Sequence, residues 1–415
     1  MPIPFVFLFV SLVLLIGLEI YAYQATRVLL KNSSTTWKTW VPKLYLGQAI
    51  LMLGLLVSLF FIQRGTPFFI FGLAIVFMAS FGKLLAVLII FFDDIRRVIK
   101  WFFQGRKRSY EKAKSSGNSM PRSKFLAKSA VALAFLPVAT MSFGIISGAY
   151  DYRIRRRKVY LPNLPKSMEG LKIAQLSDIH SGSFFDQKAV SGGIDLLMKE
   201  KPDVVFFTGD LVNNETKEVR DYQAIFSRLK ADYGVYSTLG NHDYGDYKSW
   251  GSQAAKRQNM ADMIQVHEQM GWRLLMNQNE QIRIGSDQLS IIGVENWGVG
   301  RFAKYGNLEK AVQGAEGDVK ILLSHDPSHW DAQVRPQQPD IDLTLSGHTH
   351  GMQLGVEIGD WRWSPSQYIY KQWADLYQEN NQYLYVNRGF GFLGFPGRIG
   401  ILPEITILEL TSRPA

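Results

Sequence analysis

The sequence predicts a fold in two parts: about four membrane-spanning helices, followed by a layered α+β domain. The first 150 residues hold four long apolar stretches and are far more apolar than the rest of the 415-residue chain. From about Leu171, short runs rich in β-branched and aromatic residues alternate with longer amphipathic segments, which is typical of α/β or layered α+β domains. We therefore predict a transmembrane helical anchor over residues 1–150, a basic linker over 151–170 and a separate domain over 171–415.

The four apolar stretches are each close to the roughly 20 residues that a helix needs to cross a bilayer. One of them contains Lys83, which has to face other helices or reach toward the interface. The stretch richest in small residues contains Pro137, and a buried soluble helix is the alternative for that one alone. The stretches cover Ile3–Tyr23, Tyr45–Ile62, Phe68–Phe92 and Ser129–Tyr150.

Lysines and arginines cluster in the segment 93–128, between the third and fourth stretches, and cytoplasmic loops carry an excess of these residues. We expect this basic loop to be cytoplasmic. Four spans then place the C-terminal domain outside the cytoplasm, on a bacterial-type inner or plasma membrane. The segment "RIRRRK", Arg153–Lys158, opposes this orientation, and a domain on the cytoplasmic face is the alternative. The basic residues of the loop are Arg96, Arg97, Lys100, Arg106, Lys107, Arg108, Lys112, Lys114, Arg122, Lys124 and Lys128.

The chain contains no cysteine, which excludes disulfides and thiolate-bound metals. Any metal must be bound by His, Asp, Glu, Asn or backbone atoms, a ligand set that favours Mn, Fe, Zn or Mg. The formal net charge of +10 could indicate a nucleic-acid partner, but the basic residues gather around the apolar stretches. No basic run follows Lys158 within the domain, so we expect the lipid bilayer, and no nucleic acid, as a partner.

Several predicted strands of the domain end in a residue that can bind a metal. The runs include "LKIAQL", "DVVFFT", "GVYSTL", "VKILLS" and "IDLTLS", and the carboxyl ends of strands are where such sheets place ligands. Taken singly, the "SDIH", "TGD" and "GNHD" that follow three of them are also ordinary cap and turn sequences. With "SHD" and "GHTH" they hold five of the seven histidines, and we interpret the other two, His267 and His329, as structural or solvated. The metal-competent residues are Asp178, His180, Asp210, Asn241, His242, His325, His348 and His350.

The last motif, "SGHTHG", places two histidines one residue apart between glycines. In an extended backbone, residues i and i+2 project to the same side, which would direct His348 and His350 toward a shared metal pair. Gly347 and Gly351 would let the backbone turn tightly around them.

The ordered set of motifs resembles the calcineurin-like metallophosphoesterases over approximately Leu171–Leu410. This resemblance implies a β-sandwich flanked by helices and a metal-dependent phosphohydrolase activity. The ending "NRGFGFLGFPGRIGILPEITILEL" is similar to that of membrane-anchored members related to UDP-2,3-diacylglucosamine hydrolases. By the same resemblance, two divalent metal ions (Mn, Fe or Zn) are bound, one by Asp178, His180, Asp210 and His350 and the other by Asp210, Asn241, His325 and His348.

Phosphoester hydrolysis requires neutralised phosphate charge and a nucleophile made from water, and two divalent metals roughly 3.5–4 Å apart supply both. Such a pair needs an anionic bridge, for which Asp210 at the end of the second strand is the natural candidate. The resemblance makes His242 the group that stabilises or protonates the leaving oxygen. Many relatives carry an acidic partner for this histidine three positions after the bridging aspartate, where this chain has Asn213. Asp243 is a poor substitute because successive residues on an extended chain point apart, and we therefore favour substrates with good leaving groups, such as diesters or pyrophosphates.

An anchored site beside the bilayer suggests a lipid-linked or amphiphilic phosphate, such as the UDP-2,3-diacylglucosamine of a lipid A-type pathway. That substrate is made on the cytoplasmic side, so an extracytoplasmic phosphodiesterase or phosphatase of other substrates is an alternative. Arg398 could bind a substrate phosphate or only cap the sheet. The aromatic segment Trp361–Tyr377 could lie at the membrane interface or form a packed cap.

A catalytically dead membrane sensor or scaffold is the alternative of a different class. Metal ligands are intact at every motif, which argues against it. Metal-dependent hydrolysis of a generic phosphodiester distinguishes the two hypotheses.

Overall fold

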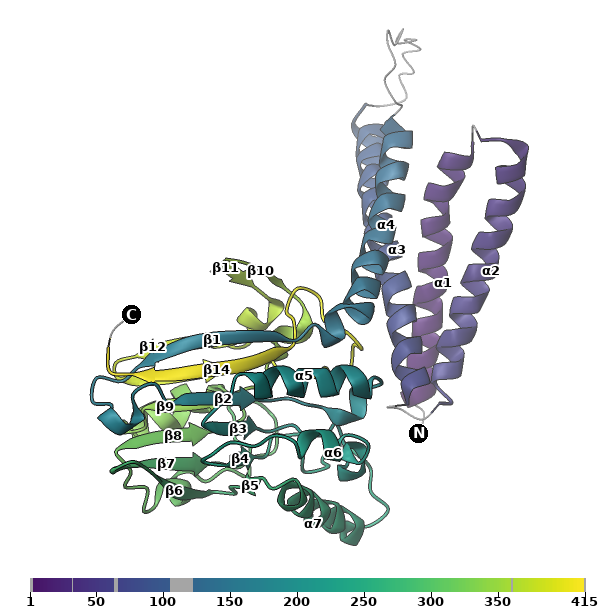
Figure 1. Cartoon of the computed structure of the whole chain (residues 1–415). Coiled ribbons are helices and arrows are strands. Elements are labelled where there is room, and N and C mark those ends of the chain that lie inside the picture. The colour runs from purple at the N-terminus through teal and green to yellow at the C-terminus, as the bar shows by residue number, and fades with distance from the viewer. Residues whose placement is uncertain (1–2, 32, 63–65, 105–121, 360, 414–415) are drawn as a thin grey trace. The chain divides into compact units, whose positions relative to one another are not determined.

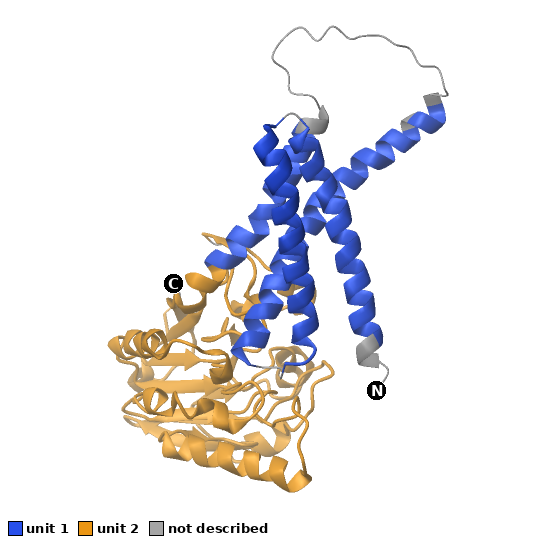
Figure 2. Ribbon diagram, turned by 90° about the vertical axis from the view of Figure 1, so that its right-hand side faces the viewer, with its two compact units in different colours: residues 1–143 blue, residues 144–415 orange. Residues whose placement is uncertain are grey.

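The chain folds into two compact units, residues 1–143 and 144–415 (Figure 2). The computed structural model describes the whole chain apart from residues 1–2, 32, 63–65, 105–121, 360 and 414–415. Part of the predicted basic loop therefore lies outside the described residues, namely Arg106, Lys107, Arg108, Lys112 and Lys114.

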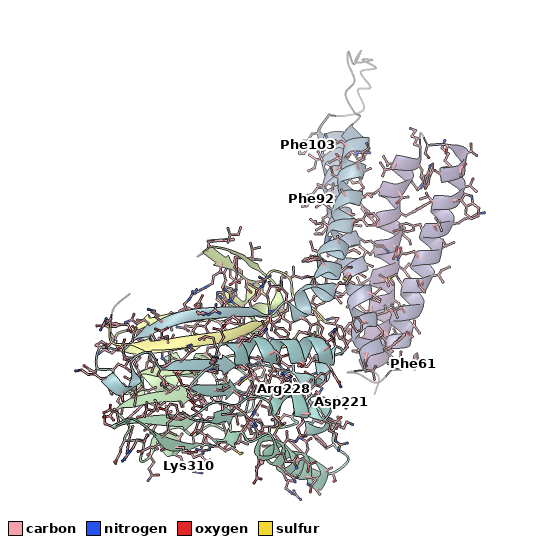
Figure 3. All side chains as sticks on the ribbon, viewed as in Figure 1. Phe61, Phe92, Phe103, Asp221, Arg228 and Lys310 are labelled. Atoms are coloured by element: carbon pink, nitrogen blue, oxygen red, sulfur yellow. The ribbon has the colours of Figure 1, made fainter. Side chains whose placement is uncertain are left out.

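The first unit contains four apolar helices, each long enough to cross a bilayer (Figure 1). In the most apolar part of each helix, only 11–28% of the residues are buried. Most apolar side chains therefore face outward, as expected for helices surrounded by lipid. Phe92 and Phe103 of α3 are examples (Figure 3). The predicted anchor of about four spans is confirmed. The helices are α1 (Ile3–Leu30), α2 (Thr35–Leu59), α3 (Pro67–Gln104) and α4 (Arg122–Ile146), and the last residues of α4 belong to the second unit.

Lys83 of α3 faces the other helices, which is one of the two alternatives predicted for it. Its ammonium group pairs with the carboxylate of Glu19 on α1 and donates to Gln48 Oε1 on α2 at 2.9 Å. The hydroxyl of Tyr45 on α2 donates to the carbonyl of Glu19 at 3.0 Å. Ionisable groups inside a membrane segment are tolerated when they face the bundle interior and are paired, so this cluster joins three helices at low cost.

The second unit is a sandwich of two six-stranded sheets, ordered β1-β14-β2-β3-β4-β5 and β12-β13-β9-β8-β7-β6. Strands β2, β3 and β4 run parallel, and so do β7, β8 and β9, which brings the carboxyl ends of each set to one edge of its sheet. The predicted layered β-sandwich flanked by helices is confirmed. The strands are β1 (Arg153–Tyr160), β2 (Lys172–Leu176), β3 (Val204–Thr208), β4 (Val235–Thr238), β5 (Arg273–Leu274), β6 (Gln278–Ile284), β7 (Asp287–Gly293), β8 (Val319–Leu323), β9 (Leu343–Ser346), β10 (Val356–Ile358), β11 (Trp361–Trp363), β12 (Asp375–Glu379), β13 (Gln382–Val386) and β14 (Glu404–Thr411).

Alternate side chains of each strand serve different layers of this unit. Phe206 of β3 points into the core between the sheets, where Ile321 and Leu323 of β8 lie. Phe207 points to the other side and packs with residues of α5 and α7, such as Ile194. Because both faces are covered, these strands are apolar throughout. The helices of this unit are α5 (Gln187–Lys199), α6 (Gln223–Phe226), α7 (Gln253–Gln269), α8 (Leu308–Val312) and α9 (Arg335–Gln337).

The segment 151–170, predicted as a linker, contains a strand of the first sheet instead. Strand β1 pairs in parallel with β14 from Arg153 to Tyr160. Its arginines do not remain free to flank a membrane: Arg157 forms an ion pair with Asp375, and Arg155 and Arg156 are also paired with carboxylates. Arg157 and Asp375 are 218 positions apart, so the local sequence could not reveal the pairing.

Candidate metal centre

The metal-competent residues all follow the carboxyl ends of strands, as the motifs predicted. Asp178 and His180 follow β2, Asp210 follows β3, and Asn241 and His242 follow β4. Across the sandwich, His325 follows β8, and His348 and His350 follow β9. The structure brings all eight residues together from the two sheets.

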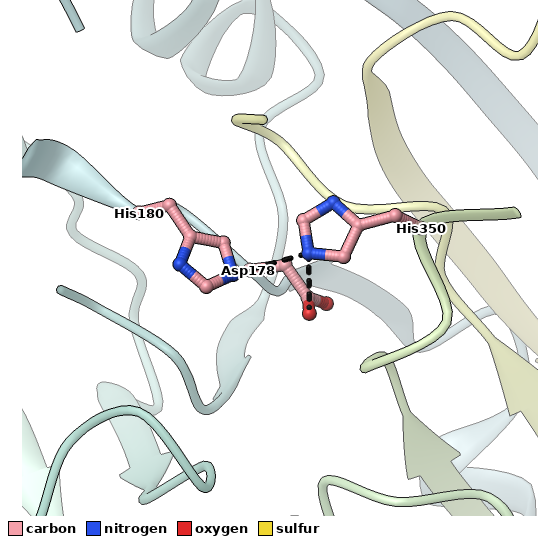
Figure 4. Close-up of side chains that lie close together, drawn as sticks. All are labelled: Asp178, His180 and His350. Carbon is pink, nitrogen blue, oxygen red and sulfur yellow. Dashed lines mark hydrogen bonds and ion pairs between the residues drawn. The ribbon is translucent and has the colours of Figure 1, made fainter. Parts of the chain in front are cut away.

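Three of these residues form a first cluster, made by Asp178, His180 and His350, whose ligand atoms lie within 4.8 Å of one another (Figure 4). His350 Nε2 lies 3.1 Å from Asp178 Oδ1 and 3.1 Å from His180 Nε2. All three side chains are buried. One carboxylate oxygen and two imidazole nitrogens therefore converge on one point.

Asp210, His325 and His348 form a second cluster with the same 4.8 Å limit. His325 Nε2 lies 3.1 Å from Asp210 Oδ2 and 3.2 Å from His348 Nδ1. The same Asp210 oxygen is 3.4 Å from His180 Nε2 in the first cluster. Asp210 therefore lies between the clusters, where the sequence predicted a bridging carboxylate.

Hydrogen bonds to the far side of each imidazole direct one ring nitrogen into the centre. His180 Nδ1 is 3.0 Å from Asn213 Oδ1, and His325 Nδ1 is 2.7 Å from the carbonyl of Thr208, so both rings present Nε2. His348 Nε2 is 2.8 Å from the hydroxyl of Tyr370 and therefore presents Nδ1. Such partners orient metal-binding histidines.

The donor set fits two divalent cations. Asn241 donates from Nδ2 to the hydroxyl of Tyr247 at 2.8 Å, while its Oδ1 is buried and has no hydrogen-bond partner, as expected for an atom reserved for a metal. The set contains oxygen and imidazole nitrogen and no thiolate, which suits Mn, Fe or Zn. We infer that the first cluster with Asp210 would hold one ion, and the second cluster with Asn241 the other.

The charge state of the centre also favours cations. Burial disfavours the charged form of His325, but the neighbouring Asp210 carboxylate outweighs burial and raises the pKa of His325 to about 10. Burial opposes ionisation of Asp178 and Asp210 as well, yet the surrounding histidines hold the pKa of both carboxyls below the usual range. The carboxylates therefore stay negative, and a bound cation would take over from the protonated His325 as the positive partner of Asp210.

The loops that carry the ligands are not extended, which corrects the expectation for "SGHTHG". Thr349 is in the right-handed helical region, with φ −76° and ψ −26°, between two left-handed residues. The two histidines diverge, His348 to the second cluster and His350 to the first. Left-handed φ values recur at five ligands, and such non-glycine residues are typical of functional sites. They are Asp178 (52°), His180 (49°), Asp210 (61°), His348 (69°) and His350 (50°).

His242 lies beside the clusters and is half-buried. Its backbone N–H donates to Asp210 Oδ1 at 2.9 Å, and its Nδ1 lies 2.7 Å from the backbone carbonyl of Asn213. The Asn213 side chain faces His180, so the amide does not replace an acidic partner of His242. The carbonyl of Asn213 accepts from Nδ1 instead, which leaves Nε2 of His242 free to carry a proton.

Asp243 holds two ligand loops together, a role that the sequence did not indicate. The buried carboxylate accepts from the backbone N–H groups of Asp210 (2.9 Å), Leu211 (2.8 Å), Val212 (3.3 Å) and Gly240 (2.9 Å). Burial, together with the negative charge of Asp210, raises the pKa of Asp243 to about 7.

Arg398, predicted as a possible phosphate ligand, is buried and already occupied. Its guanidinium donates to the carbonyls of Gly391 (2.8 Å) and Gly389 (3.1 Å), and Nη2 lies 3.2 Å from His350 Nδ1. Only 1% of the residue is exposed. Arg398 therefore supports the His350 loop. Its guanidinium is buried and is not exposed to a phosphate in solution.

Two tyrosines complete the centre, and the motifs gave no signal for them. Tyr370 contacts His348 and Tyr247 contacts Asn241, as described above. Tyr370 belongs to the aromatic segment Trp361–Tyr377, which the sequence connected only with the membrane or a cap. His267 and His329 are fully buried and lie in neither cluster, in agreement with a structural role.

Comparisons with known proteins agree with the class of protein that this fold and site define, a metal-dependent phosphoesterase. Residues 171–352 match the family model described as "Calcineurin-like phosphoesterase", and residues 3–149 match "Probable Calcineurin-like phosphoesterase, transmembrane domain". The chain belongs to the calcineurin-like metallophosphoesterase family.

Three relatives illustrate the similarity. The chain is 30% identical to the uncharacterized metallophosphoesterase YkuE of Bacillus subtilis, over 60% of this chain and 82% of the relative. It is 29% identical to a transmembrane protein with metallophosphoesterase domain from Danio rerio and 30% identical to one from Bos taurus, over 74% and 68% of this chain. The chain spans 66% and 63% of the length of these two vertebrate proteins.

Proposed function

We propose that this protein hydrolyses a phosphoester or pyrophosphate of an amphiphilic, lipid-linked substrate at a membrane surface. The observation that carries the proposal is the position of Asp210, whose Oδ2 lies 3.4 Å from His180 Nε2 and 3.1 Å from His325 Nε2. A carboxylate shared by two histidine clusters suits a pair of divalent ions. Family membership supports the hydrolase activity.

Two bound divalent ions would neutralise phosphate charge and lower the pKa of water. The residues around the ions would supply a proton to the leaving group and orient the ligand side chains. His242 can protonate the leaving oxygen from Nε2, because its Nδ1 is held by the carbonyl of Asn213. Tyr370 and Asn213 keep the ligand rings of His348 and His180 in one orientation.

An amphiphilic substrate is supported by a groove next to the second cluster. The groove has a volume of about 500 Å³, and Tyr370 lines it while contacting His348. The side chains of Val299 and Ile369, 63% and 66% exposed, form apolar walls. An apolar wall beside a phosphate site fits a substrate with an apolar part, and the four spans hold the enzyme where such substrates concentrate.

We further propose that the second unit lies outside the cytoplasm. The basic residues Arg96 and Arg97 lie in the C-terminal part of α3, after the apolar stretch Phe68–Phe92, and an excess of such residues favours the cytoplasmic side. The opposing segment Arg153–Lys158 forms β1, and three of its arginines are paired with carboxylates of the same unit, which weakens the case for the cytoplasmic face. A phosphatase reporter fused after Ala415 is expected to be active outside the cytoplasm. If the phosphatase fusion is inactive and a fluorescent reporter fused at the same position is active, the second unit lies in the cytoplasm. That result would favour a cytoplasmic substrate such as UDP-2,3-diacylglucosamine.

The catalytic proposal is tested with the full chain purified in detergent and bis-p-nitrophenyl phosphate as substrate. We expect hydrolysis that a chelator abolishes and that Mn²⁺, Fe²⁺ or Zn²⁺ restores. His242→Ala should keep both metals and lose about 10²–10⁴-fold in rate. A chain that binds two metals per molecule but hydrolyses neither this diester nor p-nitrophenyl phosphate nor a pyrophosphate would favour the sensor or scaffold hypothesis instead.

A further inference from the structure

The hairpin formed by β10 and β11 carries an exposed apolar face. The two strands are antiparallel, with Val356 opposite Trp363 and Ile358 opposite Trp361, so these four side chains share one face of the hairpin. Ile358 is 70% exposed, Trp361 59% and Val356 42%. The hairpin pairs with neither of the two six-stranded sheets. Nothing in the described part of the second unit covers this face.

The opposite face of the hairpin is charged and points into the protein. Glu357 forms ion pairs with the fully buried Arg388, at 2.8 Å, and with Arg155 of β1. Arg362 pairs with Asp375 at 2.9 Å. A surface hairpin normally places charged side chains outward and apolar side chains inward. This hairpin reverses that pattern, which is the arrangement expected where the outside is apolar.

Further exposed apolar side chains flank the hairpin in the sequence. Met352 and Leu354, which precede β10, are 42% and 43% exposed. After β11, the hydroxyl of Tyr368 accepts from Trp363 Nε1 at 3.3 Å, and Tyr368 and Ile369 are 75% and 66% exposed. Tryptophan and tyrosine with an apolar body and a polar edge are enriched where hydrocarbon meets water. Exposed apolar patches mark interaction surfaces.

Within the second unit, the base of the hairpin is joined to Gly144 through the segment Arg398–Ile399. The backbone N–H of Arg398 donates to the carbonyl of Gly144 at 3.1 Å, and the next residue, Ile399, accepts from Gly355 N–H at 2.9 Å. Ile399 also forms a β-bridge with Leu354. The fit is close: a Cβ on Gly148 would lie 2.0 Å from the carbonyl oxygen of Arg398. Gly144 and Gly148 belong to the candidate span Phe125–Tyr150 and, by their contacts, to the second unit.

We infer that the apolar face of the β10–β11 hairpin inserts into the lipid interface. The hairpin is connected to the metal centre at both ends: it begins a few residues after His350, and the hydroxyl of Ser364 after β11 donates to the carbonyl of Gly351 at 2.6 Å. Insertion of the hairpin therefore sets the orientation of the His350 loop toward the membrane surface. This inference rests on the surface and the spans; only its consequence for catalysis rests on the proposed function.

The chain has no cysteine, so single-cysteine variants allow a direct test of insertion. Ile358→Cys and Trp361→Cys are labelled with the environment-sensitive dye NBD in the full chain, reconstituted in phosphatidylcholine–phosphatidylglycerol nanodiscs. Ile264→Cys on α7 is the matched control, because Ile264 is also an exposed apolar residue, 43% accessible. We expect blue-shifted emission at positions 358 and 361, quenched by lipids that carry a shallow doxyl group. The label at position 264 should emit as in water and be quenched by iodide.

Two outcomes would overturn the inference. One is emission at positions 358 and 361 that matches position 264, with equal quenching by iodide. The other is a blue shift that doxyl lipids do not quench and that grows with protein concentration, which would indicate that a second copy of the chain covers the face. Neither readout depends on catalysis, so it stands whether or not the protein proves to be a hydrolase.

A second measurement tests the consequence for catalysis. Ile358→Asp combined with Trp361→Asp should lower kcat/KM by about tenfold for a phosphoester presented in vesicles, because the site is no longer held in a productive orientation. Hydrolysis of soluble bis-p-nitrophenyl phosphate by the same variant should stay at the wild-type rate. Equal kcat/KM for vesicle substrate in the variant and the wild type would refute the orienting role.

Discussion

Replacing Asp210 by asparagine is the perturbation that most directly tests the two-ion centre. The carboxylate is 2% exposed, and its Oδ2 lies 3.1 Å from His325 Nε2 and 3.4 Å from His180 Nε2. Asparagine has the same shape and keeps one oxygen, so Oδ1 can still accept from the N–H of His242. The substitution therefore removes negative charge and leaves the packing almost unchanged.

The expected magnitude follows from the charge that is lost. Two unit charges about 4 Å apart interact by about 4 kcal/mol at an effective dielectric constant near 20. A divalent ion doubles this to about 8 kcal/mol. If the amide oxygen of asparagine recovers half of this interaction energy, about 4 kcal/mol is lost, which corresponds to about a thousandfold weaker binding of the metal ion. Because Asp210 lies between both clusters, both ions should be affected.

The assay is the metal content of the purified full chain, measured by inductively coupled plasma mass spectrometry. A second assay is the titration of the chelator-treated protein with Mn²⁺. The matched control is Asp262→Asn on α7, a half-buried aspartate outside the centre, which should retain wild-type metal binding and hydrolysis. Asp210→Asn should lose both. An Asp210→Asn chain that binds two ions with unchanged affinity, or that keeps its metal-dependent turnover, would refute the bridging role.

Three further predictions concern the surroundings of the centre, the anchor and the core. Asn213→Ala should weaken metal binding about 10–100-fold in a Mn²⁺ titration, because a ligand ring loses its acceptor, whereas Asn213→Asp should bind nearly as the wild type. Lys83→Met leaves the carboxylate of Glu19 buried without its cation, so the thermal unfolding midpoint of the detergent-solubilised chain should fall, and adding Glu19→Leu should restore part of the loss. Burial lowers the pKa of His267 from 6.5 to about 3, so the unfolded chain binds a proton that the folded chain excludes. The contribution of neutral His267 to the free energy of unfolding is therefore fully present above pH 6.5 and is lost toward pH 3, by up to about 5 kcal/mol. His267→Asn should flatten this pH dependence of the unfolding midpoint.

The ligand set could be predicted because each ligand immediately follows an apolar strand. Parallel strands such as β2 and β3 bring their carboxyl ends to one edge, so Asp178 and Asp210 are brought close together by the topology alone. The supporting residues could not be predicted in this way. Asp243 was expected only to be a poor acidic partner for His242, whereas its carboxylate accepts from four backbone N–H groups of two ligand loops. Tyr370 reaches His348 from a segment with no motif of its own.

Hydrogen bonds within the protein also hold the loops of the metal centre in place. Left-handed backbone at a non-glycine residue costs about 1–3 kcal/mol, and five of the seven predicted ligands adopt it. The carboxylate of Asp178 accepts from the N–H of His348 at 2.9 Å, which joins the β2 loop of one sheet to the β9 loop of the other. Asp243 joins the β3 and β4 loops in the same manner. Because these bonds arise from the packed sandwich, the two-sheet fold itself offsets the backbone strain, and the ligands are positioned before a metal ion binds.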